Sequence, residues 1–187
     1  MRNFIYLLIL ILMVGSASAQ KFRSGVFLHH STGGNIWGPN GSSTSVPQEI
    51  EQYNIDNGYF GDDECSLTEQ GWPTNPWNNE WARWHKIFDN EDPNADIRPY
   101  LNNNKIVIIK SCFPSSHMVG WGGPSDTLNP DRKTVFNYKW HWRSFLRVMR
   151  EHPDNFFVVW TNSPLVGGST DDTEAFFAHH FCKWAKD

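Results

Sequence analysis

Residues 31–35 (STGGN) place a hydroxyl beside two glycines and an amide, directly after a short apolar run at residues 25–29 (GVFLH). A serine nucleophile needs an exposed hydroxyl, a nearby base, and backbone N–H groups that stabilise the negative oxygen formed during acyl transfer. Glycines next to the serine let the backbone turn without a side chain in the way. The segment is therefore a candidate nucleophile loop. A simple turn with a capping serine is the alternative.

Two further polar segments follow apolar runs in the same manner. Residues 111–117 (SCFPSSH) come after 105–110 (KIVIIK), and residues 161–168 (TNSPLVGG) come after 156–160 (FFVVW). Apolar runs without alternation are typical of strands that are covered on both faces, as in parallel sheets. The carboxyl ends of parallel strands meet at one edge, where α/β proteins bind their ligands. We expect the three polar loops to converge there.

Amphipathic helices separate these strands. Residues 80–88 carry aromatic side chains at spacings of three and four, and residues 132–151 have a continuous apolar face. A shorter helix should have Pro47 in its first turn, and a final helix should begin after the hydroxyl and acidic caps at residues 169–172. Strands that alternate with such helices predict an α/β sandwich with a parallel sheet.

Four segments together resemble the SGNH (GDSL-type) hydrolase family. The run VFLHHSTGGNIW (26–37) resembles the first block of the family, with HHS in place of Gly-Asp-Ser. The segments IVIIKSCFPSSHM (106–118), FFVVWTNSPLV (156–166) and TEAFFAHHFCKWAKD (173–187) resemble, in order, a later strand with its loop, the next strand and the following helix. The resemblance implies a three-layer α/β/α sandwich with a flavodoxin-like sheet. It also implies a serine ester hydrolase that needs no cofactor.

The resemblance makes Ser31 the nucleophile, with its own N–H as one oxyanion donor. The Asn donor of the family has no strict match here, because serines occupy the corresponding loop, and each serine hydroxyl can donate one hydrogen bond. The remaining candidate donors and substrate-binding residues are Gly33, Gly34, Asn35, Ser115, Ser116 and Asn162.

The general base is the missing part of this pattern. In the family, the base and its carboxylate come from an Asp-x-x-His segment after one more strand, and no such segment precedes Asp187. Either the chain is a fragment, or the base comes from elsewhere in the sequence, or catalysis has been lost. We expect a domain that is incomplete at its C-terminus, with its last strand missing and a hydrophobic sheet edge left unpaired.

Residues 1–19 have the features of a secretory signal. They contain a positive residue, Arg2, an apolar run at residues 4–14, and the small-residue cleavage pattern ASA at residues 17–19. The run is too short to span a bilayer, although a membrane anchor is the alternative. Cleavage would leave one domain, residues 20–187, that is secreted or periplasmic and not stably inserted in a membrane.

Composition excludes several partners. The chain has 16 Lys and Arg against 20 Asp and Glu, a net charge of −4, and no basic stripe, which argues against nucleic acid. No Cys or His spacing matches a metal site. The three cysteines, Cys65, Cys112 and Cys182, allow one disulfide with three possible pairings.

The expected ligand is a small-molecule or glycan ester, such as an acylated carbohydrate. The alternative function is a non-catalytic glycan-binding protein on the same fold. That alternative depends on a tryptophan-rich stretch, for which packing of a long loop is the simpler explanation. The tryptophans are Trp72, Trp77, Trp81 and Trp84.

Overall fold

The computed structural model describes residues 22–74 and 79–187, so the predicted signal at residues 1–19 lies outside the described part. The strands are β1 (Ser24–His29), β2 (Ser66–Gly71), β3 (Ile106–Lys110) and β4 (Phe156–Trp160). The helices are α2 (Thr32–Trp37), α3 (Val46–Asn57), α4 (Glu80–Phe88), α5 (Arg98–Asn103), α6 (Val135–Arg150) and α7 (Asp172–Lys186). Short 3-10 helices are η1 (Gly61–Asp63), η2 (Phe113–Ser116) and η3 (Pro124–Leu128).

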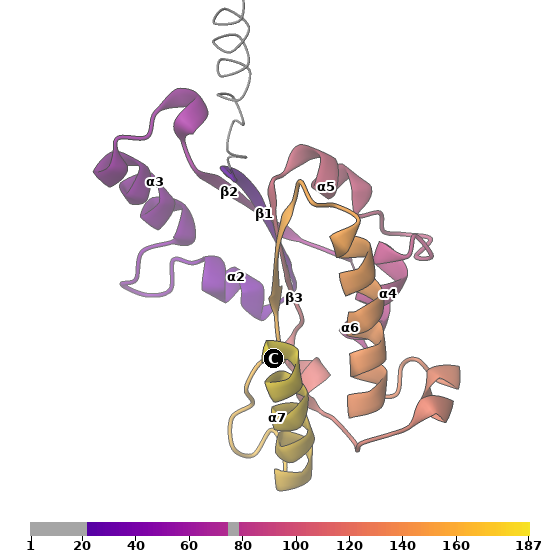
Figure 1. The fold of residues 1–187 in the computed structure, drawn as a ribbon. Helices are drawn as coiled ribbons and strands as arrows, with labels where there is room; N and C mark the ends of the chain where they lie inside the picture. Colours follow the sequence, from indigo (N-terminus) through magenta and orange to yellow (C-terminus); the bar gives the residue numbers. More distant parts are fainter. Residues whose placement is uncertain (1–21, 75–78) are drawn as a thin grey trace, which may run out of the picture.

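The four strands form one parallel sheet in the order β2-β1-β3-β4. Figure 1 shows this sheet between two helical layers, with α2 and α3 on one side and α4, α5 and α6 on the other. The predicted α/β fold with a parallel, flavodoxin-like sheet is therefore confirmed. Across residues 22–74 and 79–187, no helix combines the length and apolar character needed to cross a bilayer.

The main core lies between the sheet and the layer of α4, α5 and α6. Alternate side chains of the two central strands, such as Leu28 and Ile109, are completely buried against this layer. The helices contribute large aromatic rings, and Trp81 of α4 stacks on Phe145 of α6 with ring centroids 6.1 Å apart. The predicted helical stripe of residues 80–88 is thus core packing.

The opposite face of the sheet is covered unevenly. Phe27 of β1 packs under Trp37 of α2, with ring centroids 6.5 Å apart. At the β4 edge, however, Phe156 is 53% exposed and Trp160 is 41% exposed. The prediction that residues 156–160 are buried on both faces was wrong, because β4 is an edge strand whose terminal rings remain partly open to solvent.

Local sequence signals account for where the longer helices begin. Ser45 caps α3 in a reciprocal capping box with Gln48, and Pro47 occupies the first turn as predicted. The Asn79 side chain accepts hydrogen bonds from the first N–H groups of α4. The cap of α7 is the Asp171 carboxylate, not a hydroxyl of Ser169 or Thr170 as the sequence suggested. A carboxylate is favoured there because it also faces the positive end of the helix dipole.

A pair of histidines, of which His141 is buried and His85 partly exposed, links α4 to α6. His141 Nε2 lies 2.9 Å from the Pro130 carbonyl oxygen, and His141 Nδ1 lies 2.9 Å from His85 Nδ1. Burial lowers the pKa of His141 to about 3. Burial also lowers the pKa of His85, although Asp89, 3.1 Å from His85 Nε2, opposes that change.

This pair predicts an acid-sensitive fold. Because the folded-state pKa of His141 lies below its unfolded value of about 6.5, the unfolded state binds the extra proton first as the pH falls. The free energy of unfolding should therefore drop by about 2 kcal/mol between pH 8 and pH 5 from His141 alone. Urea titrations of the wild type and His141→Phe over this range measure the effect. Equal pH dependence in both proteins would contradict it.

Candidate active site

The three polar loops converge at the carboxyl ends of β1, β3 and β4. An open pocket of about 730 Å³ is lined by Thr32 and Asn35 from the first loop, Lys110 at the end of β3, and Thr161 and Asn162 after β4. Its remaining walls are largely apolar and include Ile36, Phe113, Val159, Trp160 and Pro164. Parallel pairing of the strands brings the three loops to one edge of the sheet, as the sequence predicted.

Ser31 stands immediately before Thr32, at the exposed start of α2. Its backbone has φ 41° and ψ −106°, a conformation that residues with a side chain adopt only under strain. Its hydroxyl makes no capping hydrogen bond, so the alternative of a capping serine is wrong. Strained backbone of this kind is concentrated at functional sites.

The glycines shape the turn rather than expose their own donors. The N–H of Gly33 donates to the His30 carbonyl oxygen at 2.8 Å, and the N–H of Gly34 donates to the Ser31 carbonyl oxygen at 3.0 Å. Within the described residues, the N–H groups of Ser31 and Thr32 have no hydrogen-bond acceptor. These two groups, rather than those of Gly33 and Gly34, are the free donors of the turn. Asn35 is exposed and lines the pocket.

Glu80, at the start of α4, holds the loops after β1 and β3. The carboxylate is buried, with one oxygen 2.6 Å from His30 Nδ1. Its other oxygen accepts hydrogen bonds from the Cys112 backbone N–H and from the Ser115 hydroxyl, the latter at 3.2 Å. The second nitrogen of His30 faces the Pro73 carbonyl oxygen. Both ring nitrogens of His30 therefore face oxygen acceptors, and His30 acts as a structural donor beside Ser31.

The predicted donors on the other two loops are engaged internally. The Ser116 hydroxyl donates to the Ser163 carbonyl oxygen, and the Ser115 hydroxyl donates to Glu80 as described above. Asn162 donates to the Ser115 carbonyl oxygen at 3.0 Å and accepts from Trp81 Nε1 at 2.8 Å. Ser115, Ser116 and Asn162 thus hold the floor of the site together, and their donor hydrogens point away from the pocket.

Lys110 is the main residue of the site that sequence reasoning missed. Its Nζ lies 2.9 Å from Thr32 Oγ1 and 2.8 Å from the Ser111 carbonyl oxygen. Burial lowers the pKa of this amine, while Cys112 and Glu80 act in the opposite direction. A lysine at the inner end of an otherwise apolar strand was the available signal, because such a charge needs a partner once it is buried.

A histidine–carboxylate pair lies beyond η2. His117 Nδ1 is 2.9 Å from Glu174 Oε2, and Thr170 Oγ1 is 3.0 Å from the same oxygen. The hydrogen bond from His117 lowers the pKa of the Glu174 carboxyl group. This pair could not be predicted from the sequence, because its two members lie 57 residues apart rather than in one Asp-x-x-His segment.

The described residues form neither a disulfide nor an exposed tryptophan wall. Cys65, Cys112 and Cys182 are all free thiols, so none of the three possible disulfides forms. In residues 22–74 and 79–187, no three His, Cys, Asp or Glu side chains gather in a metal-binding group. Three tryptophans of the proposed glycan wall are buried in the core, and the fourth, Trp77, lies outside the described part. The buried ones are Trp72, Trp81 and Trp84.

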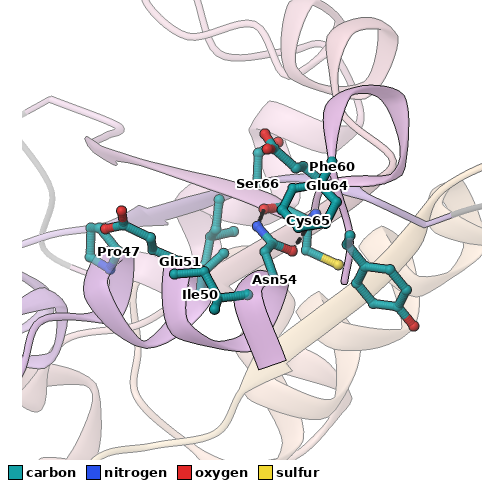
Figure 2. A pocket seen from close by; sticks show the side chains of 11 residues that line it. Pro47, Ile50, Glu51, Asn54, Phe60, Glu64, Cys65 and Ser66 are labelled. Carbon is teal, nitrogen blue, oxygen red and sulfur yellow. Dashed lines mark hydrogen bonds between the residues drawn. The ribbon is translucent and has the colours of Figure 1, made fainter. Parts of the chain in front are cut away.

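A second cavity, of about 400 Å³, lies between α3 and the amino end of β2 (Figure 2). Its labelled lining residues include Pro47, Ile50 and Glu51 from α3. Asn54 hydrogen-bonds both the N–H and the carbonyl oxygen of Cys65 there, at 2.9 and 2.8 Å. None of the three polar loops after β1, β3 and β4 contributes to the lining of this cavity. The pocket beside Ser31 is the better candidate site.

No model of a known protein family, no curated protein and no solved structure matches this chain in the comparisons made. The chemistry of the site is therefore inferred from its own geometry.

The fit between the turn and β1 gives a direct test of this geometry. A Cβ atom added at Gly33 would lie 2.1 Å from ring atoms of His29, whereas one added at Gly34 would meet nothing within 4 Å. Gly33→Ala should therefore destabilise the protein by about 1–3 kcal/mol through overpacking. The neighbouring Gly34→Ala should change the stability by less than about 1 kcal/mol. Urea unfolding of the two variants measures the difference, and equal midpoints would refute the close approach.

Proposed function

We propose that this protein is an exported serine ester hydrolase that acts on acylated carbohydrates or similar small esters. The observation that carries the proposal is Ser31 itself. It combines an exposed hydroxyl that makes no cap, a strained backbone, and two unpaired N–H groups in the same turn. A turn that served only to begin a helix would not need this strain.

In the proposed reaction, Ser31 Oγ attacks the ester carbonyl and forms an acyl-enzyme. The N–H groups of Ser31 and Thr32 stabilise the negative oxygen, because they point from a fixed turn and have no acceptor among the described residues. Loss of the alcohol and attack by water complete the cycle. No cofactor takes part in these steps.

The pocket beside Thr32 suits a small acyl ester. Its largely apolar walls can receive an acyl group, while Asn35 and Thr161 offer polar contacts to an alcohol such as a sugar. The signal-like pattern of residues 1–19 supports export, and the acidic net charge fits a neutral ester better than a polyanion. The glycan-binding alternative loses its main support, because Trp72, Trp81 and Trp84 are buried.

Removal of the nucleophile tests the proposal. Ser31→Ala should lower the hydrolysis of 4-nitrophenyl acetate and of an acetylated sugar by about 10³-fold or more, because the substitution removes the attacking hydroxyl. Ser43→Ala, which alters an exposed serine of the next loop, is the matched control and should keep full activity.

A fluorophosphonate probe provides a second measurement. It should label the wild type at Ser31, as located by peptide mass spectrometry, and should fail to label Ser31→Ala. Full esterase activity in a folded Ser31→Ala protein would refute the hydrolase proposal.

A further inference from the structure

Lys110 is a buried amine that the proposed reaction has not yet used. It is the last residue of β3, pairs in register with Trp160 of β4, and is only 2% exposed. A fully buried lysine is rare unless its charge is paired or its amine has a task. Within the described residues, no carboxylate lies within ion-pair distance of its Nζ.

The surroundings of the Lys110 amine weaken its hold on the proton. Its two hydrogen-bond partners, Thr32 Oγ1 and the Ser111 carbonyl oxygen, carry no charge. Glu80 of α4 and Cys112 of the following loop are the titratable groups that act on it, and β1 beside it ends in His29, which is paired with Glu69. Burial outweighs these charges and lowers the pKa of Lys110. A neutral amine can accept a proton from an alcohol at hydrogen-bond distance.

The amine also lies where substrate would bind. Lys110 and Thr32 both line the pocket of about 730 Å³, and Thr32 follows Ser31 directly in the turn. The other candidate bases are less suited. Both ring nitrogens of His30 face oxygen acceptors, and His117, paired with Glu174, has no described contact with residues 31–35. The His29 ring also packs against this loop, at Gly33, but Lys110 is the basic side chain with a printed hydrogen bond to a hydroxyl of the loop, that of Thr32.

We propose that Lys110 holds the proton removed from Ser31 and acts through the hydroxyl of Thr32. This inference rests on the proposed hydrolase function. As Ser31 Oγ bonds to the acyl carbon, its proton passes to Thr32 Oγ1 and the Thr32 proton passes to Lys110 Nζ. The ester C–O bond then breaks, and the departing alkoxide takes a proton back from the Lys110 ammonium by the same path. Water repeats both transfers and releases the acid.

Substitutions in the full chain test this path with 4-nitrophenyl acetate. Lys110→Met and Thr32→Val should each lower kcat by about 10²–10⁴-fold and leave KM nearly unchanged. Thr32→Ser, which keeps the hydroxyl, should restore most of the activity lost in Thr32→Val. Lys110→Arg should stay inactive, because a guanidinium does not give up its proton. Lys105→Met, at the exposed residue directly before the same strand, is the matched control and should leave kcat unchanged.

An NMR titration of the lysine amines tests the proposal without an activity measurement, so it remains informative if a variant loses activity through misfolding. After reductive methylation with ¹³C-formaldehyde, the NMR signal missing from Lys110→Arg identifies Lys110. That signal should lose its proton at a lower pH than the signals of the exposed lysines, and the acid limb of kcat/KM should follow it.

The outcomes separate the two proposals. Loss of activity in Ser31→Ala, with full activity in Lys110→Met or Lys110→Arg, would overturn this inference and leave the hydrolase function standing. A Lys110 signal that titrates together with the exposed lysines would also overturn it. Full activity in Ser31→Ala would overturn both proposals.

Discussion

The buried carboxylate of Glu80 fixes the geometry on which the candidate site depends. An ionised group placed in the interior costs several kcal/mol unless donors surround it. Here the donors come from separate parts of the chain, namely His30 after β1 and the Cys112 N–H and Ser115 hydroxyl after β3. None of these segments can shift without leaving the charge unsatisfied. The requirement to satisfy one carboxylate therefore sets the positions of two of the three loops relative to α4.

Asn162 fixes the position of the third loop. Its amide joins the chain after β4 to the Ser115 carbonyl oxygen and to the indole of Trp81, which is completely buried in the core. The floor of the pocket is thus held by fully engaged polar groups. Above it, Ser31 and the first residues of α2 are largely exposed, and their backbone hydrogen bonds go mainly to residues close by in the sequence. A rigid floor under an accessible hydroxyl is the arrangement that preorganised catalysis requires.

The sequence was sufficient for the architecture but not for the polar contacts of the site. Strong apolar runs identified β1, β3 and β4, and periodicity identified α4 to the residue and α6 to within three residues. β2 was missed because its residues 66–71 (SLTEQG) are polar and mostly exposed, so no alternation of apolar residues marks it. The burial of β4 was overestimated for a related reason. A run of five apolar residues does not reveal whether its strand lies at the centre or at the edge of a sheet.

For the site itself, the sequence predicted which loops meet and which serine stands at the turn. It could not predict where each donor hydrogen points. Ser115 and Asn162 were expected to face a substrate and instead bind Glu80 and Trp81, because those long-range partners exist only once α4 has docked. The contact of Lys110 with Thr32 spans 78 residues and has no local signature at all.

The close approach of Gly33 to His29 has a consequence for how such a sequence can change over generations. While a histidine ring occupies position 29, a side chain at position 33 has no room. Replacement of His29 by a smaller residue would open that space and, with it, leave Glu69 without its present partner. Substitutions at positions 29, 33 and 69 are therefore expected to be correlated, and Gly33 can be exchanged only after His29 has become smaller.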